Sequence, residues 1–127
     1  MDNLIYTGKV GFGLQNGTRW GFPTANISDI TPRFTLENGV YAVHVIINGK
    51  RWNAMMYIGT RPTLKLTKPT VEIHIFDFAQ NIYNQSIQFH VLQKIRDEQT
   101  FNSIDSLIGQ LKKDEEITRS FFHSKHI

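Results

Sequence analysis

From Gly39 to Ile58 the chain reads GVYAVHVIINGKRWNAMMYI, and this stretch predicts a β-hairpin. Two runs rich in β-branched and aromatic residues flank Asn48-Gly49, the dipeptide that a tight two-residue hairpin turn favours. Gly59 and Pro62 then break the second run, because glycine frees the backbone and proline cannot donate a hydrogen bond to a β-ladder. We therefore expect two antiparallel strands here, followed by a loop to about residue 69.

Alternating apolar residues predict further strands on both sides of this hairpin. Residues 71–78 and 86–92 alternate most clearly, and shorter strands are expected near residues 4–10 and 25–27. In the first of these runs, Glu72, His74 and Phe76 share the face that points away from the core. The core-facing residues predicted from the alternation are Val71, Ile73, Ile75, Ile87, Phe89 and Val91.

The number and spacing of these strands indicate an all-β fold. About six short strands would occupy residues 4–95, joined by connections that are too short for helical crossovers, so the sheet should be antiparallel. Closure into a Greek-key-like barrel would remove the exposed edges of such short strands. We expect a single domain, residues 1–127, because a chain of this length needs only one core.

The C-terminal segment changes to a helical period and predicts a helix over about residues 103–122. Asn102 or Ser103 is suited to cap its first turn. Its apolar stripe is expected to pack on the barrel, since amphipathic helices usually face their own core. The stripe consists of Ile104, Leu107, Ile108, Leu111, Ile117 and Phe121.

Composition narrows the classes of function. The chain has no cysteine, which excludes disulfides, thiolate nucleophiles and cysteine-bound zinc. Its formal charge of +3 favours anionic ligands such as nucleotides without demanding nucleic acid. No secretory signal and no apolar run long enough for a membrane helix is seen, so a soluble, cytoplasmic protein is expected.

The segment Gly21-Phe22-Pro23-Thr24-Ala25-Asn26 is the first candidate site. In an extended backbone Thr24 and Asn26 point the same way and offer two neutral oxygens to a small hard cation. Pro23 would hold the pair rigid. Glycines upstream, including Gly11, Gly13 and Gly17, would let backbone N–H groups approach a phosphate chain. The alternative is a glycine-rich turn that merely leads into a strand.

Glu72, His74 and Arg96 are the other candidates. Glu72 is a mid-strand carboxylate, and it is either a general base, if its face lines a pocket, or the solvated side of a strand. His74 is interpreted as a pocket-lining or facing residue, because Glu72 and His74 alone do not make a zinc site. Arg96 belongs to a charged connection between the last strand and the helix, or to the rim of a ligand site.

Taken in order, these segments resemble the riboflavin kinase family, in the form found at the C-terminal end of bacterial bifunctional FAD synthetases. The resemblance runs from Tyr6 to Asp114 and depends on the order of several motifs rather than on any one of them. The motifs are the glycine-rich opening, residues 21–26, residues 39–43, residues 58–63, residues 71–75, Ile82-Tyr83, residues 96–98 with Phe101, and residues 107–110 with Asp114.

This resemblance implies a six-stranded barrel with a C-terminal helix and a specific reaction. The reaction is transfer of the ATP γ-phosphoryl to the ribityl 5′-hydroxyl of riboflavin, which gives FMN and ADP. The resemblance assigns Mg²⁺ and phosphate binding to Thr24 and Asn26, and the role of general base to Glu72. The segment from Gly11 to Gly17 would cover the ATP phosphates, and Arg96 would border the flavin. An FMN adenylyltransferase domain would precede these residues in a bifunctional chain.

Three positions depart from the family pattern. Thr18 separates Gly17 from the basic Arg19, Tyr57 stands where an asparagine is common, and Asn84 replaces a glycine in a turn. Two alternative functions follow from this sequence. One is a flavin-binding module without kinase activity, and the other is a small barrel that binds single-stranded nucleic acid, which the modest charge disfavours.

Overall fold

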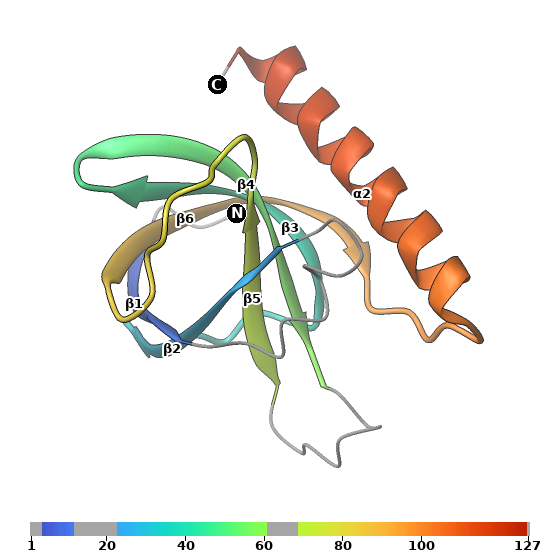
Figure 1. Cartoon of the computed structure of the whole chain (residues 1–127), viewed down its shortest axis with the longest axis horizontal. Helices are drawn as coiled ribbons and strands as arrows, with labels where there is room; N and C mark the ends of the chain where they lie inside the picture. The colour runs from blue at the N-terminus through green and yellow to red at the C-terminus, as the bar shows by residue number, and fades with distance from the viewer. Residues whose placement is uncertain (1–3, 12–22, 61–68, 127) are drawn as a thin grey trace.

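A computed structural model describes residues 4–11, 23–60 and 69–126 of the chain (Figure 1). Within these residues there are six strands and one long helix. The strands are β1 (Ile5–Gly11), β2 (Ala25–Thr31), β3 (Gly39–Ile47), β4 (Lys50–Gly59), β5 (Thr70–Ile75) and β6 (Ser86–Asp97), and the helix is α2 (Ile104–Lys125).

The strands form a closed antiparallel barrel in the order β1-β2-β5-β4-β3-β6. Strands β3, β4 and β5 follow one another as a meander, and the last of them, β5, lies beside β2. This is a Greek-key arrangement. Pairing of β1 with β6 closes the barrel, so each of the six described strands has a partner on both sides. Helix α2 lies diagonally outside the barrel, as Figure 1 shows. The predicted fold class is confirmed.

The hairpin has the turn that its sequence predicts. Asn48 and Gly49 both have positive φ angles, 51° and 78°, as a two-residue turn of the primed type requires. Its strands pair from Gly39 opposite Ile58 to Ile47 opposite Lys50. Asn84, the residue found in place of a glycine, also has a positive φ of 68°, a geometry that asparagine tolerates.

Several predicted boundaries are wrong. Strand β2 extends to Thr31 and not to about residue 27, and the helix ends at Lys125 and not at about residue 122. The strand expected over residues 71–78 ends at Ile75, because Asp77 turns the chain with a φ of 57°. Strand β6 extends to Asp97, so Arg96 lies in a strand and not in the connection to the helix.

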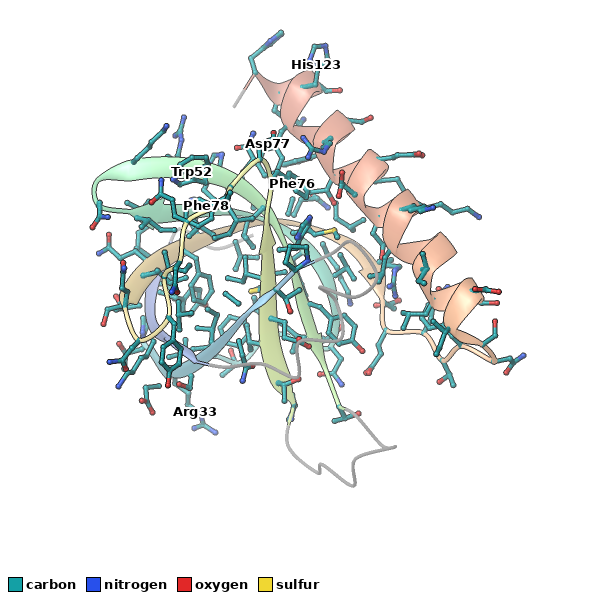
Figure 2. All side chains as sticks on the ribbon, in the orientation of Figure 1. Arg33, Trp52, Phe76, Asp77, Phe78 and His123 are labelled. Atoms are coloured by element: carbon teal, nitrogen blue, oxygen red, sulfur yellow. The ribbon has the colours of Figure 1, made fainter. Side chains whose placement is uncertain are left out.

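The barrel interior is the main core. It contains every core-facing residue predicted from the alternation of β5 and β6, together with Tyr41, Met56 and Ile58. Trp52 and Phe78 pack against it with ring centroids 4.8 Å apart, and Figure 2 shows them together at one side of the barrel.

A second core lies between the helix and the outer faces of β3 and β4. Its buried members are Val40, Ala42, Met55, Phe76 and Phe122. The predicted helical stripe is wrong at two places, since Ile104 and Ile117 are 59% and 52% exposed. Asp114 and Thr118 are buried instead. Ser103 caps the helix by accepting a hydrogen bond from the Ser106 N–H at 3.1 Å.

Candidate functional site

Neighbouring strands bring four residues of the candidate site into one row. Gly11 of β1 pairs with Asn26 of β2, Asn26 pairs with Glu72 of β5, and Glu72 pairs with Tyr57 of β4. Residues directly opposite each other in an antiparallel sheet point to the same face. The next residues along, Ile27 and Val71, belong to the interior core. Asn26, Glu72 and Tyr57 therefore lie on the outer face of the barrel.

The predicted metal ligands and the predicted base meet in this row. Thr24 Oγ1 donates a hydrogen bond to Glu72 Oε1 at 3.0 Å, and Asn26 stands directly opposite Glu72. Because the Thr24 hydroxyl is the donor in this hydrogen bond, the lone pairs of Oγ1 stay available to a cation. Hydroxyl, carboxamide and carboxylate oxygens are the ligand types that Mg²⁺ prefers. The donor chemistry of this cluster thus fits a magnesium–phosphate site.

Glu72 is buried although it lies on the outer face. Its exposed fraction is 6%. The interpretation of this face as a merely solvated strand surface is therefore wrong. A buried, rigidly held carboxylate has the properties that a general base needs.

Of the three candidate glycines, the described residues include only Gly11. Gly11 ends β1 beside Asn26, and a Cβ there would make an ordinary contact with the Asn26 carbonyl at 4.0 Å, so space alone does not require glycine at this position. Gly13 and Gly17 lie outside the described residues, as does Thr18.

Arg96 forms a bidentate ion pair with the helix. Its Nε and Nη2 donate to the two carboxylate oxygens of Asp114 at 2.8 and 2.9 Å, and Gln110 Nε2 donates to the same carboxylate at 2.9 Å (Asp114 Oδ1). Asp114 is fully buried, and the Arg96 side chain is 12% exposed. The guanidinium therefore fastens α2 to β6, while its assignment to the flavin rim stays a prediction.

Tyr57 forms a polar cluster that sequence reasoning missed. Its hydroxyl donates to Glu98 Oε1 at 3.0 Å, and Asn38 Nδ2 donates to Glu98 Oε2 at 2.8 Å. The phenol ring also covers Gly59, where an added Cβ would collide with it. Tyr57, which pairs with Glu72 on the neighbouring strand, thus places a phenol ring beside the candidate base.

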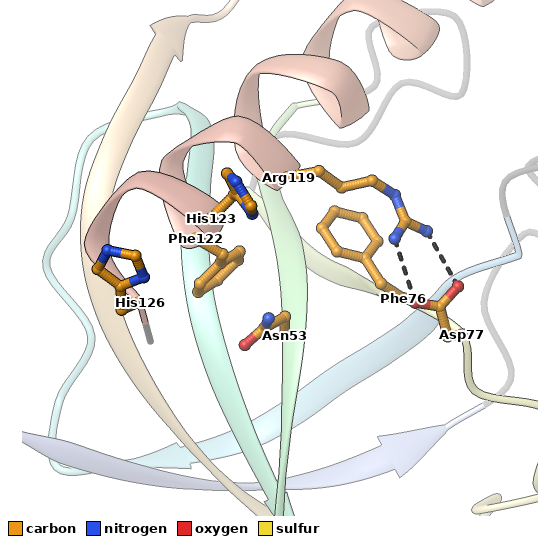
Figure 3. Close-up of a pocket in the computed structure, with 7 residues that line it drawn as sticks. All are labelled: Asn53, Phe76, Asp77, Arg119, Phe122, His123 and His126. Atoms are coloured by element: carbon orange, nitrogen blue, oxygen red, sulfur yellow. Dashed lines mark hydrogen bonds and ion pairs between the residues drawn. The ribbon is translucent and has the colours of Figure 1, made fainter.

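A separate pocket of about 440 Å³ lies under the last turns of α2 (Figure 3). Arg119 is held there by Asp77, with contacts of 3.1 and 3.3 Å to the two carboxylate oxygens. The pocket does not include Thr24, Asn26 or Glu72. Its lining residues are Asn53, Phe76, Asp77, Arg119, Phe122, His123 and His126.

His44 lies beneath this end of the helix and makes folding stability depend on pH. It stacks on Phe122 with ring centroids 5.3 Å apart and is only 5% exposed. Burial, and then the charges of Arg51 and His90, lower the pKa of His44 below its ordinary value, although a hydrogen bond with Asn53 opposes the shift.

We expect this lowered pKa to cost stability in mild acid. The unfolded chain takes up a proton at His44 near pH 6.5 and the folded chain only at lower pH, so stability is complete above 6.5 and falls below it. The slope contributed by one such group is at most about 1.4 kcal/mol per pH unit. Urea unfolding between pH 7.5 and 5 should be less pH-dependent in His44→Gln than in the parent, and equal slopes would contradict the prediction.

No helix in the described residues is long and apolar enough to span a membrane.

A family model described as Flavokinase: Riboflavin kinase matches residues 2–122. The bifunctional riboflavin kinase/FMN adenylyltransferase of Haemophilus influenzae is 41% identical over 118 residues, which cover 92% of this chain and 38% of that protein.

Solved structures also share the fold. The crystal structure of macrolide-efflux protein from Streptococcus pneumoniae gives a TM-score of 0.81 at 38% identity, covering 92% of this chain and 38% of that one. The crystal structure of riboflavin kinase from Trypanosoma brucei gives a TM-score of 0.61 at 26% identity, covering 94% and 79%. The chain spans less than half the length of curated relatives such as the Haemophilus influenzae protein.

Proposed function

The chain belongs to the riboflavin kinase family, and we propose that it transfers the γ-phosphoryl group of ATP to the ribityl 5′-hydroxyl of riboflavin. The products are FMN and ADP. The observation that carries this proposal is the hydrogen bond of 3.0 Å between Thr24 and the buried Glu72, with Asn26 directly opposite that carboxylate. It joins a candidate base to two oxygen ligands on adjacent strands.

Glu72 takes the proton in this mechanism. As the ribityl oxygen forms its bond to the γ-phosphorus, the bond from that phosphorus to the β,γ-bridging oxygen breaks and ADP leaves. The hydroxyl proton passes to the Glu72 carboxylate. Since Glu72 sits mid-strand and is held by Thr24, its position is fixed before substrate arrives, which lowers the entropic cost of reaching the reactive geometry.

Thr24 and Asn26 would hold Mg²⁺ through Oγ1 and the side-chain carbonyl. When bound, Mg²⁺ neutralises charge on the phosphates and orients them. We assign Gly11, Gly13 and Gly17 to contacts between backbone N–H groups and the ATP phosphates. Arg96 is assigned to the flavin rim, where its β6 position and the helix would border the ring. A cytoplasmic location belongs to the same proposal, since ATP is the phosphoryl donor.

An FMN adenylyltransferase domain is the proposed N-terminal partner of these residues in the whole protein. Relatives with the bifunctional name are more than twice as long as the matched region. With such a domain the chain would convert FMN further to FAD.

Conversion of riboflavin to FMN tests the proposed function directly. The purified chain, ATP and Mg²⁺ should give FMN on chromatography, and the same mixture with excess EDTA should give none. Tight flavin binding without FMN would instead support a flavin-binding module that lacks kinase activity. A salt-sensitive shift of an oligonucleotide would point to nucleic-acid binding.

Replacement of Asn26 by alanine should weaken nucleotide binding selectively. Loss of one metal ligand is expected to raise the dissociation constant of Mg·ADP about tenfold, or about 1.4 kcal/mol, and to change riboflavin affinity less than about twofold. Calorimetric titration of each ligand measures both values. The exposed Gln80→Ala is the control for loss of a carboxamide. Equal weakening of both ligands by Asn26→Ala would indicate a folding defect.

A further inference from the structure

We propose that His74 is a positioning residue that holds the Pro23–Thr24 peptide in place for the metal–phosphate site, and that helix α2 orients its ring through Glu115. The inference builds on the proposed function. It concerns a residue of β5 that lies two positions after Glu72 and on the same outer face of the barrel.

The contact between His74 and Pro23 defines the role of one ring nitrogen. His74 Nδ1 lies 2.7 Å from the Pro23 carbonyl oxygen. A carbonyl oxygen can only accept a hydrogen bond, so Nδ1 carries the proton and donates it. Nδ1 therefore has no lone pair to offer a metal. Through this nitrogen His74 acts on the site by holding the backbone and not by ligating a metal.

The position of this carbonyl makes the contact effective. Pro23 and Thr24 precede β2, whose pairing with β5 extends only from Ala25 opposite Ile73. The Pro23 carbonyl belongs to the peptide that joins Pro23 to Thr24, and a peptide is planar, so fixing its oxygen fixes the plane that leads into Thr24.

Two side chains of β5 thus hold two consecutive residues beyond the end of the backbone ladder. His74 binds the Pro23 carbonyl, and Glu72 binds the Thr24 hydroxyl. If the first contact is lost, Thr24 keeps its hydroxyl bond but gains backbone freedom. The oxygen offered to Mg²⁺ is then less well placed.

Helix α2 holds the other side of the ring. Glu115 Oε1 lies 3.4 Å from His74 Nε2, a contact that becomes an ion pair when Nε2 carries a proton as well as Nδ1, and the His74 side chain is 12% exposed. Glu115 is itself fixed by Arg119 Nε at 3.0 Å. The ring also meets Phe76 edge-on, with centroids 5.6 Å apart and an angle of 70°. This places the imidazole between the helix and the segment that leads into Thr24, so the position of the helix is coupled to that of the segment.

Two substitutions of His74 separate hydrogen bonding from packing. His74→Asn keeps an N–H donor near the position of Nδ1, whereas His74→Phe keeps a ring and loses the donor. We expect His74→Phe to raise the KM for Mg·ATP and the dissociation constant of Mg·ADP about tenfold, with the riboflavin KM within about twofold. His74→Asn should recover most of this loss. His123→Phe, an exposed position on α2, is the matched control and should change none of these values.

Several outcomes would overturn the role of His74. These are equal loss of Mg·ADP affinity in His74→Asn and His74→Phe, a parallel rise in both substrate KM values, or unchanged Mg·ADP binding in His74→Phe. Thermal unfolding of each variant identifies a folding defect. If the parent chain makes no FMN, the proposed function fails, but calorimetry of Mg·ADP without riboflavin still tests His74. A parent that does not bind Mg·ADP overturns both.

Glu115→Ala tests the contribution of the helix. It should weaken Mg·ADP binding in the same direction as His74→Phe but less, and the effects of the two changes should not add, because residues in one contact chain are coupled. Unchanged Mg·ADP binding in Glu115→Ala would remove the helix from the proposal.

Discussion

Replacing Glu72 by glutamine should lower turnover at least about 100-fold while riboflavin and Mg·ADP still bind. General-base catalysis typically contributes about 10²–10⁴ to a rate, and a carboxamide cannot take the hydroxyl proton. Glutamine has nearly the same shape, and its side-chain carbonyl can still accept the hydrogen bond that Thr24 donates over 3.0 Å. Loss of rate should therefore appear in kcat and not in the affinities.

The comparison needs turnover and binding from the same preparations. Steady-state FMN formation gives kcat, and calorimetry gives the affinities for riboflavin and Mg·ADP. Glu116→Gln, at an exposed position of α2, is the matched control and should retain parental turnover. Near-parental turnover in Glu72→Gln would remove Glu72 from the role of base. Because glutamine can still accept the Thr24 hydrogen bond, joint loss of binding and turnover would mean instead that the negative charge of Glu72 is needed to bind the ligands.

Local patterns predicted the barrel well because they report directly on which face of a strand is buried. The alternation of residues 71–75 and 86–92 identified interior residues correctly, and Asn48-Gly49 identified the turn. The boundaries were less well predicted. The apolar residues of the run from 71 to 78 continue beyond Asp77, where the chain turns with a positive φ angle. The spacing of apolar residues gives no sign of this turn.

The helix shows why apolar periodicity alone was insufficient. Asp114 is buried because Arg96 and Gln110 satisfy its carboxylate, and Thr118 is buried because its hydroxyl donates to the Asp114 carbonyl at 2.7 Å. These partners come from β6 and from the helix itself. Ile117 consequently faces solvent, although its residue type predicts the opposite. The presence of both Arg96 and Asp114 among the family motifs was the signal that could have identified the pair.

The candidate site was predicted as separate residues and not as a constellation. Thr24 and Glu72 are 48 positions apart, and their contact requires β2 to pair with β5 across two intervening strands of sequence. No short-range pattern encodes that pairing. The burial of Glu72 was not predicted either, because the face opposite an interior core is usually solvated in an antiparallel sheet. The contact between His74 and Pro23 arises from this pairing too.

Replacing Asp114 by alanine should lower the free energy of unfolding by about 3 kcal/mol. Breaking a buried ion pair by removing one partner leaves an uncompensated charge, and such changes typically cost about 3–5 kcal/mol. Arg96 retains 12% exposure, which favours the lower end of that range. The melting temperature should fall by roughly 10 °C. Glu116→Ala, on the exposed side of the same helix, should change it little, and a similar loss in both variants would contradict the prediction.

A paired substitution distinguishes the structural role of Arg96 from a role in flavin binding. Arg96→Met combined with Asp114→Leu removes both charges, so it should recover most of the stability that Asp114→Ala loses. If Arg96 also borders the flavin, this stable double variant should still bind riboflavin more weakly than the parent, because the guanidinium that would stack on the ring is gone. Parental riboflavin affinity in a stable double variant would restrict Arg96 to fastening α2 on β6.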